Sequence, residues 1–334
     1  MSQPIRYYAA LCQVDQKNPQ NRSEMRRNTA SMLRLMEQAV VGYRPFHDIK
    51  LVVFPEFAHA APVYGEVHEL LEHLALPADN EEIALIAAKA KELSVFVQTG
   101  SFLEVDPQWP DVVFNTTLLI NADGQVISRY RKVNPWIPWE VHASPHDLPD
   151  YPDDPLPVVD TELGHLAVAT CYDWLFPEVT RTLALKGAEV LIRISAYMDP
   201  WGTTEPMNWW TLVNRTRAIE NTAYVLGCNQ GASGSHYPPF SWPGGSMAVD
   251  YDGRILAEAT PGAGEKIVVA PVDLSSLRSE RRRRMGHDMR AHHRAELYGV
   301  LARPQFPAET GPSARTIETN NELIQRSKDD LEQN

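Results

Sequence analysis

The sequence predicts an α/β protein in which two β-sheets lie between layers of helices. Three observations support this fold class. Short β-type runs alternate with amphipathic stretches, each half of the chain gives the order strand, helix, strand, helix and then hairpin, and 334 residues are enough to bury a full core. We expect residues 1–302 to form one domain and residues 303–334, rich in proline, serine, threonine and charge, to form an extended C-terminal tail.

Apolar spacing defines the elements of the first half. The stretch 21–41 has methionines and a leucine near helical spacing and stops at Gly42, whereas 49–54 is apolar except for Lys50 and suits a strand buried on both faces. Further strands are expected at 7–14 and 95–100, a helix at 81–93, and a hairpin at 115–131 around Asp123-Gly124.

The second half repeats this order. Its expected strands are 165–170, 190–195 and 223–229, its helices 176–186 and 209–221, and its hairpin strands 247–250 and 254–257 around Asp252-Gly253.

Charge and cysteine content limit the partners and the compartment. The formal net charge of −12 disfavours nucleic acid and anionic membranes, which both require a cationic face, and leaves small neutral substrates open. Three cysteines in different contexts do not form a disulfide framework, the N-terminus does not resemble a signal peptide, and apolar runs are too short to span a membrane. We therefore expect a cytoplasmic protein.

The first pattern with chemical meaning is an apolar strand that runs into Pro55 and Glu56. Proline cannot continue a ladder of backbone hydrogen bonds, so Glu56 is expected just past the strand end. A carboxylate beside apolar residues suits a general base, although an exposed loop glutamate would give the same local pattern.

The second pattern is Lys132, which ends the predicted hairpin and precedes a loop rich in proline and tryptophan. An ammonium group held there could stabilise the negative oxygen of a tetrahedral intermediate. Basic residues at strand ends are more often solvated, so this pattern alone indicates little.

The third pattern is Cys171, between the strand at 165–170 and the helix at 176–186. A tight turn at such a junction can expose a nucleophile, and the amides of a helix N-terminus favour a thiolate. A lone cysteine after a β-type run is nevertheless more often a core residue.

Together, Glu56, Lys132 and Cys171 resemble the catalytic residues of the nitrilase superfamily of carbon–nitrogen hydrolases. The resemblance covers roughly residues 5–300. It includes the surroundings of the cysteine, Cys171-Tyr172-Asp173-x-x-Phe176-Pro177-Glu178, and the later segments Arg217-Ala218-Ile219-Glu220-Asn221, Gly245-Ser246-Met247 and Asp252-Gly253-Arg254.

The resemblance implies a four-layer αββα fold and a homodimer or larger homo-oligomer paired through its helical faces. It also implies hydrolysis of a small amide to a carboxylic acid and ammonia, without a metal or other cofactor. Glu56 would take the proton of Cys171, the thiolate would attack the amide carbon, and Lys132 with the backbone N–H of Tyr172 would hold the oxyanion until water hydrolyses the thioester.

Within the superfamily, the segments 134–140 and 193–200 resemble the aliphatic amidase and formamidase branch. In that branch the glutamate that matches Glu140 is a second active-site carboxylate, which positions the substrate nitrogen and assists the lysine. A tyrosine commonly follows the catalytic glutamate there, whereas Phe57 stands here, and the segment after Cys171 is closer to general amidases. We expect Trp136, Tyr172 and Tyr197 to bind the substrate within an aromatic-walled pocket.

Several alternatives stay open. The motifs also fit an N-carbamoyl-amine hydrolase, a nitrilase, or a catalytically silent member that acts as a binding or scaffold protein. A thiol redox function would require a second cysteine near Cys171, and none lies between Val168 and Trp174. We interpret the arginine run 281–284 as a solvated or interface segment, and His287, His292 and His293 beside Asp288 as packing residues and not as a metal site.

Overall fold

The computed structural model describes residues 5–148, 150–199, 201–234, 242–302, 306 and 315–332. Within these ranges the chain forms two six-stranded sheets, each built around three parallel strands. The first sheet has the spatial order β12 (Lys266–Asp273), β1 (Arg6–Gln13), β2 (Ile49–Val53), β3 (Phe96–Asp106), β4 (Trp109–Ile120) and β5 (Val126–Arg131). The second has the order β11 (Ile255–Glu258), β10 (Met247–Val249), β9 (Tyr224–Asn229), β8 (Val190–Ser195), β7 (Gly164–Thr170) and β6 (Val159–Thr161).

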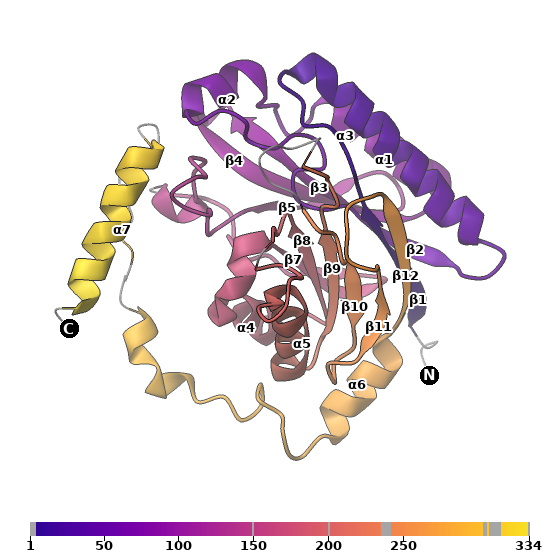
Figure 1. Cartoon of the computed structure of the whole chain (residues 1–334). Coiled ribbons are helices and arrows are strands. Elements are labelled where there is room, and N and C mark those ends of the chain that lie inside the picture. The colour runs from indigo at the N-terminus through magenta and orange to yellow at the C-terminus, as the bar shows by residue number, and fades with distance from the viewer. Residues whose placement is uncertain are drawn as a thin grey trace.

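Helices cover the outer face of each sheet, and the inner faces of the two sheets share one core (Figure 1). On the first sheet α1 (Arg22–Tyr43) and α3 (Glu81–Leu93) bury a common apolar surface, and on the second sheet α4 (Pro177–Leu185) and α5 (Trp209–Asn221) contact the parallel strands. The remaining helical elements are α2 (Val67–His73), α6 (Leu274–Arg283), α7 (Ile317–Glu332) and the short 3₁₀ helices η1 (Pro145–Asp147), η2 (Cys171–Leu175), η3 (Ala295–Leu297) and η4 (Gly299–Ala302). This arrangement confirms the predicted αββα sandwich.

The direction of the strands brings several loops to one region. β1, β2 and β3 run parallel, and β5 runs in the direction of β3 because β3–β4 and β4–β5 are both antiparallel pairs. The segments after β2 and β5 therefore leave the first sheet at the same edge, as do those after β7 and β8 in the second sheet. These four segments carry the residues that the sequence singles out.

Several predicted boundaries agree with the structure to the residue, namely those of α3, α5 and β8. The sequence did not predict α2, β6, β12 or α6. In β12 the strand pattern is interrupted by Pro271, which is tolerated because β12 is an edge strand that pairs only with β1. Cys12 and Cys228 lie fully buried in β1 and β9, as expected for core residues.

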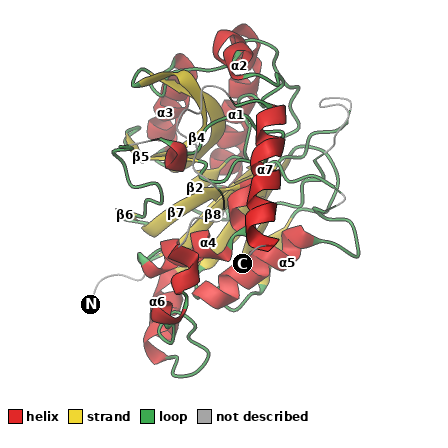
Figure 2. Ribbon diagram, turned by 90° about the vertical axis from the view of Figure 1, so that its left-hand side faces the viewer, coloured by secondary structure: helices red, strands yellow, loops and turns green. Residues whose placement is uncertain are grey.

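The C-terminal segment requires a correction. Residues 317–332, expected to be extended, form the helix α7, while 303–305, 307–314 and 333–334 lie outside the described residues. Most of the helix is polar and only Asn320 and Leu323 are buried in it, but Ile317, Ile324 and Leu331 stand at helical spacing, a signal that the polar and proline-containing composition of residues 303–334 obscured. Packing against the rest of the chain stabilises such a helix, and propensity alone does not reveal it. Figures 1 and 2 show α7 beside the sandwich, on the side opposite α1.

None of the helices in the described parts of the chain is long and apolar enough to cross a membrane.

Candidate active site

Glu56 follows β2 in a turn that backbone contacts hold in place. Ser101 donates its backbone N–H to the carbonyl of Pro55 (3.3 Å), and its Oγ accepts the N–H of Phe57 (2.9 Å). A Cβ at Gly100, which has φ +70°, would come within 2.4 Å of the Pro55 carbonyl oxygen, so only glycine allows this close approach. Glu56 is 1% exposed, which rules out the solvated loop glutamate that its sequence context allowed.

Three donors surround the Glu56 carboxylate. Its Oε1 accepts hydrogen bonds from Asn115 Nδ2 and Lys132 Nζ, both at 2.9 Å, and its Oε2 accepts the backbone N–H of Ala196 at 2.9 Å. Ala196 directly follows β8, so this carboxylate joins the two sheets. The donors fix its orientation and compensate for its removal from water.

Lys132 lies between two carboxylates. Its fully buried ammonium group contacts Glu56 and also Glu140, whose oxygens lie 3.0 and 2.8 Å from Nζ. Burial opposes the charged form, but Glu140 and Glu56 outweigh it and hold the pKa of Lys132 well above its usual value. Glu140 Oε2 also accepts the N–H of Trp136 at 2.5 Å. The three charged groups form a connected buried network.

Cys171 lies at the sharp turn between β7 and η2, with φ +48°. This left-handed conformation is strained for a side chain with a Cβ and is tolerated where the surrounding structure enforces it. Burial, and then the negative charge of Glu56, raise the pKa of the thiol, whereas Lys132 opposes them. The raised pKa means that the resting thiol holds its proton, so a base has to remove it before sulfur can attack.

Asp173 connects the lysine segment to the cysteine turn. Its carboxylate accepts hydrogen bonds from Tyr130 Oη (2.6 Å), from the backbone and side chain of Asn134 (2.8 and 3.0 Å) and from the backbone of Thr170 (2.9 Å). Tyr130 and Asn134 lie on either side of Lys132 in the sequence, and Thr170 directly precedes the cysteine. Burial raises the pKa of Asp173 to about 6.

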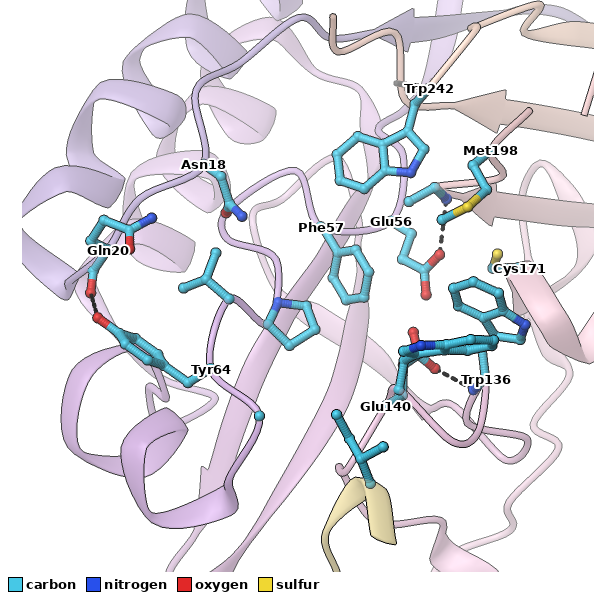
Figure 3. A pocket seen from close by; sticks show the side chains of 16 residues that line it. Asn18, Gln20, Glu56, Phe57, Tyr64, Trp136, Glu140, Cys171, Met198 and Trp242 are labelled. Carbon is cyan, nitrogen blue, oxygen red and sulfur yellow. Dashed lines mark hydrogen bonds between the residues drawn. The ribbon is translucent and has the colours of Figure 1, made fainter. Parts of the chain in front are cut away.

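Two cavities open beside Cys171. The larger, of about 560 Å³, is bordered by the carboxylates of Glu56 and Glu140 and extends to Asn18, Gln20 and Tyr64 (Figure 3). The smaller, of about 220 Å³, borders Cys171 and Tyr172 but neither carboxylate. In Figure 3, Glu56, Glu140, Trp136 and Cys171 gather at one end of the larger cavity.

The aromatic residues divide into two groups. Trp136, Tyr172 and Tyr197, the predicted substrate-binding residues, all border the smaller cavity. Trp174 and Trp210 are instead fully buried in the core.

Sequence reasoning missed several supporting residues. Asn115 stands in the predicted hairpin, and a polar residue inside an apolar strand run is a signal that could have identified it. Asn229 accepts the N–H of Tyr197 (2.8 Å) and donates to its carbonyl (3.1 Å), which fixes the segment after β8. His142 lies 3.4 Å from Glu140, and burial lowers its pKa to about 3.

The arginine run is partly packed and partly exposed, with Arg282 and Arg283 exposed, and of the three histidines only His293, which stacks on Tyr298, is not fully exposed. Arg281 donates to the carbonyls of Thr222 and Ala188, and Arg284 pairs with Asp252 and Glu280. Among the described residues, no group of three or more histidines, cysteines or carboxylates is placed to hold a metal ion.

Comparison with known proteins agrees with this geometry. The sequence model of the carbon–nitrogen hydrolase family matches residues 8–282. The chain is 29% identical to an omega-amidase, Nit3, of Saccharomyces cerevisiae over 84% of this chain and 91% of the relative, and 32% identical to a formamidase of Bacillus cereus over 81% and 76%.

Solved structures show the same fold. Yeast Nit3, described as a member of branch 10 of the nitrilase superfamily, aligns with a TM-score of 0.67 and 27% identity over 84% of this chain and 95% of its own. An amidase from Nesterenkonia sp. AN1 aligns with a TM-score of 0.68 and 20% identity over 90% and 98%, which supports the fold alone. The chain belongs to the carbon–nitrogen hydrolase family, within the nitrilase superfamily. It is an enzyme whose relatives include amidases and formamidases.

Proposed function

We propose that this enzyme hydrolyses a small amide to a carboxylic acid and ammonia through a thioester on Cys171. One observation carries the proposal: the buried network of Glu56, Lys132 and Glu140 opens into the same cavity as the cysteine. The omega-amidase and formamidase relatives point to the same reaction class.

The first step requires a base, because burial keeps the proton on the Cys171 thiol. Glu56 is the group suited to accept it, since it borders the cavity and its negative charge acts on the thiol. As sulfur bonds to the amide carbon, the carbonyl oxygen becomes negative. Lys132 and the backbone N–H of Tyr172, in the first turn of η2, would stabilise that oxygen.

The second step breaks the carbon–nitrogen bond. The nitrogen leaves as ammonia with the proton that Glu56 took from the thiol, and the acyl group stays on sulfur. Water then attacks the thioester, gives a proton to Glu56, and releases the acid as the proton returns to Cys171. The sum is one amide and one water converted to one acid and one ammonia.

Glu140 favours an amide over a nitrile. A planar amide presents N–H donors that a second carboxylate can accept, whereas a linear nitrile has none. Glu140 borders the cavity beside Glu56 and is held by Lys132 and Trp136, so it is suited to orient the amide nitrogen.

The test is ammonia release from simple amides, nitriles and N-carbamoyl amines. We expect turnover of amides by the wild type and none by Cys171→Ala. The matched controls Cys12→Ala and Cys228→Ala should retain activity at a stability cost of about 1–3 kcal/mol, because both side chains lie in the core. Full activity in Cys171→Ala would rule out the mechanism, and an inactive wild type would favour a scaffold role.

We further propose a homodimer or larger homo-oligomer in the cytoplasm. Apolar side chains on the outer faces of α4 and α5 are exposed, among them Leu185, Leu212 and Ile219, and three free cysteines without a disulfide suit a reducing compartment. Such exposed helical faces suit pairing between copies. Light scattering that shows a stable monomer at micromolar concentration would contradict the assembly.

A further inference from the structure

The smaller cavity beside Cys171 is walled mainly by aromatic side chains, with Leu175, Ala196 and Met198 between them. It borders Trp136, Trp139, Tyr172, Tyr197, Trp201 and Trp209, and no charged side chain is among the described residues that line it. The larger cavity is different, because Glu56 and Glu140 lie on its wall together with Asn18 and Gln20.

The proposed reaction, on which this inference rests, orients the substrate between the two cavities. The amide nitrogen must face Glu56 and Glu140, which border only the larger cavity, and the carbonyl oxygen must face Lys132. The third substituent of the amide carbon, the remainder of the acyl group, must then point in the remaining direction. The aromatic cavity, which also borders Cys171 but neither carboxylate, is the space that can receive it.

We propose that the preferred substrate is a primary amide with a neutral aromatic acyl group, of the arylacetamide type. Aromatic walls bind a planar apolar group by burial and ring stacking. A methyl group would leave most of the cavity unfilled. An anionic acyl group would lose its hydration there, because no cationic side chain is among the described residues that line this cavity, and Glu56 and Glu140 on the wall of the larger cavity would repel it.

The decisive measurement compares kcat/KM for phenylacetamide, acetamide and succinamate at one pH. Phenylacetamide should exceed acetamide by about 10²-fold or more, given the apolar surface that its ring buries, and succinamate should be the poorest of the three. Trp201→Ala should reduce the ratio of phenylacetamide to acetamide at least about 10-fold. Phe46→Ala, which removes an exposed aromatic side chain that lines neither cavity, is the matched control and should leave the ratio unchanged.

The outcomes separate this inference from the proposed function. If acetamide or succinamate is the best substrate, the aromatic class is wrong and the amidase proposal stands. An unchanged ratio in Trp201→Ala would also overturn the assignment of this cavity. If no amide is turned over, both proposals fall together.

A second inference comes from α7, which packs against the loop that carries Glu140. Asn320 is fully buried, and its Nδ2 donates to the backbone carbonyls of Pro138 (3.0 Å) and Glu140 (3.2 Å). Ile317 of the same helix borders the larger cavity.

An ion pair just before the helix fixes the same loop. Arg315 lies 2.9 Å from Asp147 of η1, and both side chains are nearly inaccessible to solvent. The C-terminal segment thus contacts the Glu140 loop at Pro138 and Glu140 and also contacts η1, which follows that loop, at Asp147. These contacts are unlike those of a loosely attached tail.

We infer that Asn320 is a positioning residue that acts through Glu140. Its two hydrogen bonds hold the backbone on either side of Trp139, and so set where the Glu140 carboxylate lies relative to Lys132. A carboxylate that must align an amide nitrogen is sensitive to shifts of about 1 Å.

The test pairs Asn320→Ala with Asn321→Ala, which removes an exposed amide one position along the same helix. Asn320→Ala should lower kcat about 10-fold or more, and Asn321→Ala should not. A double variant with Glu140→Gln gives the decisive readout. If Asn320 acts through Glu140, it should cost far less in that background. Equal losses in both backgrounds, or full activity of Asn320→Ala, would overturn the inference, and neither result would bear on the role of Cys171.

Discussion

The two sheets contribute to the site in different ways. The first sheet presents charge: Glu56 and Lys132 follow β2 and β5, and are buried and bonded to each other before any substrate arrives. The second sheet presents shape: Cys171 is held in a left-handed turn after β7, with a thiol whose pKa burial raises. The charged residues after the first sheet's strands therefore contribute to the stability of the fold. The sulfur of Cys171, after a strand of the second sheet, can be replaced with little effect on the structure.

The largest expected effect separates these two sides directly. Lys132→Met keeps the length of the side chain but leaves Glu56 and Glu140 buried without their cation. Breaking a buried ion pair on one side typically costs about 3–5 kcal/mol. Both Lys132→Met and Cys171→Ala should lose at least about 10³-fold in activity. Only Cys171→Ala should keep nearly the stability of the wild type.

Urea unfolding of the two variants beside the wild type measures this difference. If both variants are equally stable, the network of Glu56, Lys132 and Glu140 does not stabilise the fold. If Cys171→Ala is the less stable of the two, the contrast between the sheets is reversed.

A second prediction concerns Glu140, which extends the charged network of the first sheet. Glu140→Gln keeps size but loses charge and acceptor capacity, so a misaligned amide should react about 10²-fold more slowly. The measurement is hydrolysis of a short aliphatic amide and of its matching nitrile by both enzymes. A better nitrile substrate together with an unimpaired variant would refute the amidase assignment and leave the superfamily intact.

Whether a feature depends on local or on distant residues explains how much of the fold the sequence could predict. The bounds of α3, α5 and β8 were predicted to the residue because local sequence patterns mark each of them. α7 was missed although its apolar residues stand at helical spacing, because what holds it against the sandwich, such as the bond from Asn320 to the Glu140 carbonyl, joins residues about 180 positions apart in sequence. Stability that arises from such distant contacts leaves no local signal.

The same reasoning applies to the site. Glu56, Lys132 and Cys171 stand in recognisable motifs, so the sequence identified them. Their partners come from other segments: Ala196 contributes a backbone N–H that no side-chain pattern can indicate. The burial that raises the pKa of the Cys171 thiol likewise depends on the whole fold and has no local sequence pattern.

A third prediction tests the link between the two sides. Asp173 accepts four hydrogen bonds, from residues flanking the lysine and preceding the cysteine. In Asp173→Asn one acceptor becomes an NH₂ group that faces donors, and a buried unsatisfied group costs about 1–3 kcal/mol. Thermal or urea unfolding should show this loss, with a fall in activity because both loops shift. Unchanged stability would mean that the loops hold their positions without the link.

A fourth prediction concerns the difference in how the two sides respond to acid. Burial lowers the pKa of His59 to about 4 and that of His142 to about 3, and both lie on the side of the first sheet. Unfolded histidines take up protons near pH 6.5. Below that pH the unfolded chain binds two protons that the native chain does not, so stability falls as pH falls, by about 1.4 kcal/mol per pH unit for each histidine.

Asp173, between the sheets, acts in the opposite direction. Because its pKa is raised to about 6, the native chain binds its proton before the unfolded chain does, which offsets about one histidine between pH 6 and 4. Urea unfolding at several pH values between 4.5 and 7.5 measures the balance. His142→Gln should flatten the acid slope by about 1.4 kcal/mol per pH unit. If His142→Gln keeps the full slope, His142 is already protonated in the native protein, and its proximity to Glu140 outweighs both its burial and the charge of Lys132.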